Sequence, residues 1–175
     1  MELIKLDRDS SDIAALEKIN EEAIPLCERN SLTDLMDTGA EVTGIYHNNV
    51  PSGFIVLRRF KDIVYLAYLA VRSDLRNCGL GGKALAQLTE LYKDFSVVVE
   101  FEAPSKDAPG SDINMRRKAF YLRNGFYETG WYTFYDDTEF EIGCSKETFD
   151  ADAFAEFTRY LSTIVSDHIP EPYRK

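Results

Sequence analysis

Hydrophobic and polar positions along this chain follow two spacings. Apolar or alternating runs predict strands over residues 2–6, 42–47, 54–57, 63–71, 96–102, 126–135 and 139–144. Apolar residues three and four positions apart predict helices over residues 13–23, 31–36, 80–91, 115–122 and 154–164. Ser10 or Ser11 is the predicted cap of the first helix and Asp150 that of the last. The last helix belongs to a C-terminal helical extension over about 148–175.

The pattern changes from strand to helix around the segment RSDLRNCGLGGKAL, residues 72–85, which follows the apolar run YLAYLAV of residues 65–71. This is a loop that leads into a helix N-terminus. Glycines allow a tight turn, and the first turn of a helix leaves N–H groups unpaired at the positive end of its dipole. Such a place binds phosphate oxygens, and Arg72, Arg76 and Lys83 add positive charge.

Two familiar phosphate motifs fit this segment poorly. A P-loop needs a glycine at Asn77 and a hydroxyl residue at Ala84, so this reading fails. A dinucleotide fingerprint, G-x-G-x-x-A, fits residues 79–84, and Glu100 lies at about the expected distance. In that fold, however, the first glycine directly follows the strand, whereas here residues 72–78 intervene.

A third reading fits better. The pattern Arg76-x-x-Gly79-x-Gly81 resembles the acyl-CoA signature R/Q-x-x-G-x-G/A of the GCN5-related N-acetyltransferase (GNAT) superfamily. Downstream, Asn114 stands seven residues before Tyr121, and Gly-Phe follows at residues 125–126, which is similar to that family's second signature. The resemblance implies an α/β fold: a single domain over residues 1–175 with a mixed, twisted sheet of about seven strands flanked by helices.

The resemblance also implies acetyl-CoA as co-substrate and no metal. The cofactor-binding residues that it implies are the strand end Leu69, Ala70 and Val71, the loop residues Arg76, Asn77, Cys78, Gly79, Leu80, Gly81, Gly82 and Lys83, and Asn114.

Acyl transfer from a thioester to an amine needs a proton for the departing thiolate. By its place in the second signature, Tyr121 resembles the family's general acid. A phenol with a pKa near ~10 is protonated at neutral pH, so it can donate a proton to a thiolate whose conjugate acid titrates near ~8.5. Glu100 and Glu102 share one strand face and are candidate bases. Alternatively they are charges at the strand's end or bind a cationic acceptor, and water alone serves as the base.

The amino-acid composition limits the classes of molecule that the protein is expected to bind. The net charge of −10 argues against nucleic-acid binding and is compatible with a cationic amine acceptor. No run of residues is apolar enough for a signal peptide or a membrane span. The three cysteines, Cys27, Cys78 and Cys144, lack the spacing of metal ligands, and we predict that they are reduced thiols. We therefore expect a cytoplasmic protein, monomeric or homodimeric, that contacts neither nucleic acid nor membrane.

The sequence predicts an N-acetyltransferase that moves an acetyl group from acetyl-CoA to a primary amine, with Tyr121 as proton donor. The irregular segment over residues 103–112 is a predicted acceptor-binding loop. A non-catalytic acyl-CoA sensor is the alternative, and a nicotinamide-binding protein is a third hypothesis. The identity of the amine lies beyond the sequence.

Overall fold

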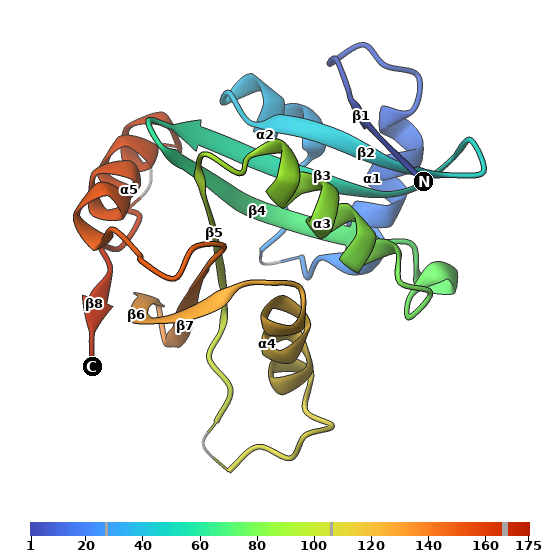
Figure 1. Ribbon diagram of the computed structural model, residues 1–175. Helices are drawn as coiled ribbons and strands as arrows, with labels where there is room; N and C mark the ends of the chain where they lie inside the picture. Colours follow the sequence, from blue (N-terminus) through green and yellow to red (C-terminus); the bar gives the residue numbers. More distant parts are fainter. Residues whose placement is uncertain (27, 106, 166–167) are drawn as a thin grey trace. The chain divides into compact units, whose positions relative to one another are not determined.

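The computed structural model describes residues 1–26, 28–105, 107–165 and 168–175. Its helices and strands are drawn in Figure 1. The chain forms two compact units. The first comprises Met1–Arg59 and Leu66–Leu88, and the second comprises Phe60–Tyr65 and Thr89–Lys175.

The first unit is built on strands in the order β1-β2-β3-β4. Its elements are β1 (Glu2–Lys5), α1 (Ile13–Ala23), α2 (Leu32–Asp37), β2 (Glu41–His47), β3 (Val50–Phe60), β4 (Ile63–Val71), the short 3-10 helix η1 (Ser73–Leu75) and α3 (Leu80–Leu91). β2 pairs antiparallel with β1 and with β3. The last residues of β3 and α3 and the first residues of β4 belong to the second unit.

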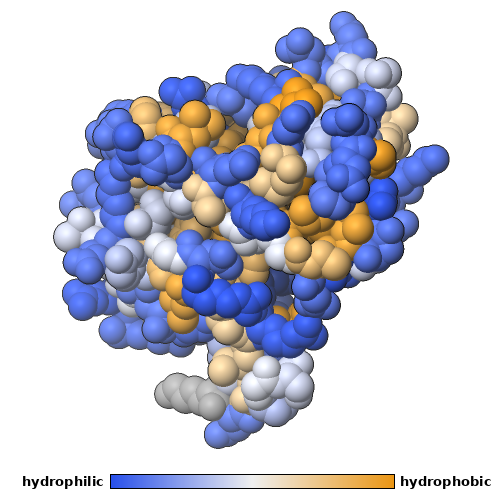
Figure 2. Space-filling view, turned by 45° about the vertical axis from the view of Figure 1, so that its right-hand side comes forward, coloured by the Kyte–Doolittle hydropathy of each residue, from blue (hydrophilic) through white to orange (hydrophobic). Residues whose placement is uncertain are grey.

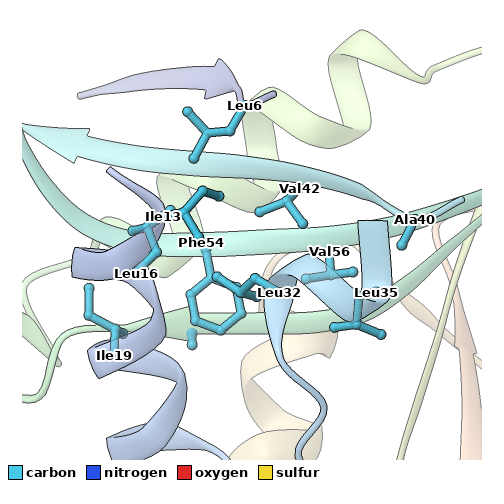
Figure 3. Close-up of a cluster of buried hydrophobic side chains, with 11 residues drawn as sticks. Leu6, Ile13, Leu16, Ile19, Leu32, Leu35, Ala40, Val42, Phe54 and Val56 are labelled. Atoms are coloured by element: carbon cyan, nitrogen blue, oxygen red, sulfur yellow. The ribbon is translucent and has the colours of Figure 1, made fainter. Parts of the chain in front are cut away.

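The core of the first unit lies where α1 and α2 cover one face of the strands (Figure 3). Alternation along the strands places Val42, Phe54 and Val56 on this face, where they join Leu16 and Leu32. All five are at most 1% exposed. The helices and strands that the hydrophobic pattern predicted thus share this core.

Helix α3 lies on the other side of these strands from α1 (Figure 1). It buries Leu80, Ala84, Leu85 and Leu88. Leu91, which the spacing placed on the same apolar face, is 71% exposed. The helix ends at Leu91, so the apolar stripe runs past the part of the helix that is covered.

The second unit contains strands in the order β5-β7-β6-β8. Its elements are β5 (Ser96–Glu102), α4 (Ile113–Arg123), β6 (Tyr127–Tyr135), β7 (Thr138–Cys144), α5 (Ala151–Val165) and β8 (Tyr173–Arg174). β7 pairs antiparallel with β5 and β6, and β8 adds a short antiparallel edge to β6. The described residues thus form eight strands, one more than expected, because β8 was not predicted.

Helix α5 packs within the second unit. Asp150 accepts a hydrogen bond from the N–H of Ala153 at 3.0 Å, which confirms the predicted cap. Phe154, Phe157 and Leu161 form one hydrophobic cluster that also contains Ile63, Val98 and Ile142 from the strands. The C-terminal extension is therefore part of this unit's core.

Two local expectations were wrong. The N-cap of α1 is Asp12, not Ser10 or Ser11, and its carboxylate accepts a 2.6 Å hydrogen bond from Tyr46 Oη instead of capping the helix. The turn after β2 is also tighter than expected. Asn48 and Asn49 both have positive φ, as a two-residue hairpin requires, so β3 begins already at Val50.

The surface drawn in Figure 2 is predominantly hydrophilic, with hydrophobic side chains in separate patches. Among the described residues, no helix combines the length and apolar composition needed to cross a membrane.

At Gly53 in β3 the structure leaves no room for a side chain. A Cβ atom there would lie 2.4 Å from the backbone oxygen of Ala70. We predict that Gly53→Ala lowers the free energy of unfolding by about 1–3 kcal/mol, because a backbone atom has to move. Urea denaturation measures this.

The matched control is Gly110→Ala, since a Cβ at Gly110 has no atom within 4 Å. Equal stability of the Gly53 and Gly110 variants would contradict the close approach of β3 and β4.

Candidate active site

The loop after β4 turns into α3 through two residues with left-handed backbone. Asn77 has φ 63° and Gly79 has φ 79°. Asparagine and glycine are the residues that most readily adopt this conformation, so the local sequence explains the turn. The loop is held to β3 at its start, where Arg72 N donates to Ser52 O at 2.9 Å.

The beginning of α3 presents free backbone donors. Its first helical hydrogen bond runs from Lys83 N to Gly79 O at 3.0 Å. Among the described residues, the N–H groups of Leu80, Gly81 and Gly82 have no acceptor. These donors lie at the positive end of the helix dipole, which is the arrangement expected of a phosphate-binding loop.

The cations around this loop differ in availability. Arg72 pairs with Asp74, at 2.6 and 3.1 Å, and this hydrogen bond raises the pKa of Arg72. Arg76 is exposed and donates from Nε to Val71 O at 3.2 Å. Lys83 has no ion pair within the described part of the chain. Arg76 and Lys83 are therefore the charges left for an anion.

The other predicted cofactor-binding residues of this unit lie at the end of β4 and within the loop. Ala70 is 4% exposed, whereas Leu69 and Val71 are half-buried at the end of β4. Cys78 is exposed, and its thiol lies 3.7 Å from Arg76 O.

Tyr121 on α4 is enclosed by aromatic rings. Its ring stacks on Phe101 of β5, with centroids 5.5 Å apart and planes at 14°, and meets Phe126 edge-on at 5.5 Å. The residue is 8% exposed, and its hydroxyl has no hydrogen-bond partner among the described residues. Burial raises the pKa of Tyr121 to about 12, and the nearby Arg117 cation opposes the rise. The phenol therefore holds its proton at neutral pH.

Helix α4 has well-defined ends. Asp112 caps it by accepting hydrogen bonds from Asn114 N at 2.9 Å and Met115 N at 3.1 Å. Gly125 has φ 87°, so the helix ends in a left-handed turn, a conformation that glycine adopts readily. Asn114 and Tyr121 are seven residues apart, which is two helical turns, so they share one face of α4.

Glu100 lies in a network of hydroxyl donors. Tyr65 Oη donates to its carboxylate at 2.8 Å and Tyr135 Oη at 3.3 Å, and Thr133 Oγ1 donates to the other carboxylate oxygen. Burial raises the pKa of Glu100, and these hydrogen bonds oppose the rise. Thr133 is fully buried, whereas Glu100 itself is half-buried.

The candidate acid and the candidate bases approach β5 from opposite faces. Phe101, on which Tyr121 stacks, alternates with Glu100 and Glu102 along the strand. Glu102 shares the face of Glu100 but has no hydrogen-bond donor among the described residues. The two carboxylates thus have different environments on the same face.

A partly buried ion cluster that the sequence does not reveal lies next to Tyr121. Lys118 Nζ lies 2.9 Å from both carboxylate oxygens of Glu141 and also contacts Glu128. Burial alone would lower the pKa of Lys118, but its hydrogen bonds to the two glutamates raise it. No sequence motif signals this cluster, since its members come from α4, β6 and β7.

The predicted site residues fall into two groups. The loop and the end of β4 belong to the first unit, whereas Glu100, Glu102, Asn114 and Tyr121 belong to the second. Of the cysteines, Cys78 and Cys144 are free thiols and Cys27 lies outside the described residues. No cluster of metal-ligating side chains occurs in the ranges that the structure describes.

The sequence profile of the Acetyltransferase (GNAT) family matches residues 13–126 of the chain. The chain belongs to this family. YjbC of Bacillus subtilis (strain 168), a protein named as an acetyltransferase, is 30% identical over 111 residues. That match covers 63% of this chain and 55% of YjbC, so the chain matches about half the length of that relative.

Solved structures confirm the fold. A protein from Bacteroides thetaiotaomicron, described as a GNAT-family acetyltransferase, is similar with a TM-score of 0.75 and 25% identity, over 94% of this chain and 98% of that one. A GNAT-family acetyltransferase from Elizabethkingia anophelis, solved with acetyl-CoA bound, has a TM-score of 0.62 at 15% identity, over 83% and 97% of the two chains. The expected α/β fold of the family is thereby confirmed.

The environment of Glu100 predicts a pH-dependent stability. Because its pKa is raised in the folded protein, the protonated Glu100 side chain favours folding. This contribution is fully present below the ordinary pKa of 4.5 and is lost as the pH rises through the folded-state value. We predict that the wild type loses stability relative to Glu100→Gln as the pH rises from about 4 towards neutrality.

Urea unfolding of both proteins across this pH range measures the difference. A difference that stays constant with pH would show that burial does not penalise the charged form of Glu100.

Proposed function

We propose that the protein is an acetyl-CoA-dependent N-acetyltransferase that acetylates a primary amine. The observation that carries the proposal is the loop before α3, where two left-handed residues precede three backbone N–H groups without acceptors among the described residues. This loop lies inside the region that matches the family, and its donors suit the pyrophosphate of coenzyme A.

Acetyl-CoA binding draws mainly on the backbone. The N–H groups of Leu80, Gly81 and Gly82 bind phosphate oxygens, and Arg76 and Lys83 add charge. In the same proposal, Leu69, Ala70 and Val71 offer peptide groups to the pantetheine amides, and Asn114 offers a side-chain amide. These peptide groups fit an amide-containing arm because a strand end leaves backbone donors and acceptors available.

Tyr121 supplies the proton in the chemical step. The amine nitrogen attacks the thioester carbonyl, an N–C bond forms, the C–S bond breaks, the thiolate takes the Tyr121 proton, and the nitrogen, cationic after the attack, releases its extra proton to water. The pKa of Tyr121, about 12, lies above that of a free thiol, near ~8.5, so the phenolate is the stronger base and takes a proton back from water. The unpartnered hydroxyl supports this role, since no hydrogen bond has to break before it donates.

The amine must be neutral when it attacks. Glu100 and Glu102 are the proposed acceptors of its proton, directly or through water, and both lie on the other face of β5 from Tyr121. An acidic protein also attracts a cationic amine, which is consistent with the net charge of −10.

Thiol release from acetyl-CoA against a panel of amines, together with calorimetric titration of acetyl-CoA alone, tests the proposal. We expect binding of acetyl-CoA and turnover with at least one amine. Saturable binding of NADH without binding of acetyl-CoA would overturn it, and binding of acetyl-CoA without turnover on any amine would favour a sensor.

We predict that Tyr121→Phe lowers kcat about 10²- to 10⁴-fold, the usual contribution of a general acid, while the dissociation constant of acetyl-CoA changes little. Steady-state kinetics and calorimetry separate the two effects. Tyr127→Phe is the matched control, because Tyr127 is 44% exposed and its hydroxyl has no partner among the described residues. Unchanged turnover in the Tyr121 variant would remove this residue from the proton-donor role.

The two classes of cation near the loop predict different effects on cofactor binding. Replacing both Arg76 and Lys83 by alanine should weaken acetyl-CoA binding about tenfold or more, because charge-assisted contacts to phosphate are lost. Arg72→Ala should change it about twofold or less, since Arg72 already pairs with Asp74. Calorimetry measures both, and equal losses would contradict the assignment.

A further inference from the structure

Helix α4 carries the proposed acid but has little hydrophobic attachment. Of its eleven residues, Tyr121 alone is fully buried. Its remaining side chains include several exposed ones, among them Ile113, Arg116 and Arg117. One buried ring does not fix how a helix is rotated about its axis or how far it has shifted along it.

The second attachment of α4 is ionic. Lys118 Nζ makes two 2.9 Å hydrogen bonds to the carboxylate of Glu141 and also contacts Glu128. The side chain of Glu141 is 4% exposed and that of Lys118 is 22% exposed. This is a partly buried pair with directional contacts, unlike the exposed ion pairs elsewhere on the chain.

The aromatic and the ionic attachment of α4 are made to neighbouring residues of two paired strands. Glu141 of β7 is the register partner of Phe101 of β5, so both side chains lie on the same face. Phe101 carries the Tyr121 ring and Glu141 carries Lys118. Lys118 and Tyr121 are three residues apart and neighbours on the helix surface, so this cross-strand pair holds consecutive turns of α4.

We propose that Lys118, bound by Glu141 and Glu128, is a positioning residue that fixes the rotation of α4 and thereby the place of the Tyr121 hydroxyl. Asn114 lies four residues before Lys118 on the same helix face, so the same contact sets its direction. The inference rests on the proposed function, because it gives Lys118 a role in turnover through Tyr121.

An ionic contact suits this purpose better than an apolar one. Apolar side chains tolerate small sliding movements with little loss of contact, whereas an ammonium group with two carboxylates has a narrow set of geometries. Acid catalysis is sensitive to such movements, since a shift of about 1 Å can lower a rate about a hundredfold.

The test replaces the pair by apolar residues of similar size, Lys118→Met with Glu141→Leu, so that no buried charge is left without a partner. We expect a folded protein with little change in the dissociation constant of acetyl-CoA and a kcat about 10- to 100-fold lower. The matched control is Arg159→Met with Glu171→Leu, which removes an exposed 2.9 Å ion pair in the same unit. It should keep the wild-type kcat.

Two further variants separate positioning from general stability. In the Tyr121→Phe background, removing the pair should lower kcat little further, because both changes act on the same proton transfer. Lys118→Arg keeps the charge and should retain more of the wild-type kcat than Lys118→Met does. Additive losses in the double-mutant cycle, or wild-type kcat in the apolar variant, would overturn the proposal.

A readout without turnover keeps this inference distinct from the proposed function. A 3-fluorotyrosine placed at residue 121 reports the ring's surroundings by ¹⁹F NMR. We expect a shifted or broadened signal when the pair is replaced and the wild-type signal in the Arg159/Glu171 control. An unchanged signal would overturn the positioning role, whereas absence of turnover in the wild type with a changed signal would overturn only the proposed function.

Discussion

The pleat of β5 is the constraint on which the second unit depends. Because successive side chains point to opposite faces, Phe101 lies on the face that receives α4, while Glu100 and Glu102 lie on the other. A shift of one residue in the pairing of β5 with β7 would move Glu100 under α4 and Phe101 away from Tyr121. The separation of the candidate acid from the candidate bases therefore follows from strand register.

Each face then satisfies its buried polar group in its own way. Glu100 accepts hydrogen bonds from three hydroxyl groups on two strands, β4 and β6, and these neutral donors leave its charge uncompensated. Glu141 is paired with the Lys118 cation, and Glu128 contacts the same ammonium group. Buried carboxylates need such partners, since desolvation without hydrogen bonds is costly. The first arrangement leaves a titratable group, and the second joins α4 to the strands through an ion pair.

The proposed cofactor contacts of the first unit come mainly from its backbone. The loop before α3 depends on left-handed conformations at Asn77 and Gly79, and its free donors are peptide N–H groups of a helix N-terminus. Of the three cations near the loop, Arg72 is already paired with Asp74. A site of this kind is visible in sequence since it needs particular residue types at fixed local spacing. The sequence does not show which charges are paired, so Arg72, Arg76 and Lys83 could not be distinguished from it.

The sequence by itself determined the family, the order of the helices and strands other than η1 and β8, the glycine-containing turn before α3 and the place of Tyr121 on a helix. These are properties of local spacing, in which hydrophobic periodicity and glycine positions decide the backbone. Only the tertiary structure decided that Tyr121 stacks on Phe101, that Glu100 is enclosed by hydroxyl groups, and that Lys118 reaches Glu141. Those contacts join residues 20 or more positions apart, and their formation depends on strand register and helix rotation, which no local pattern encodes.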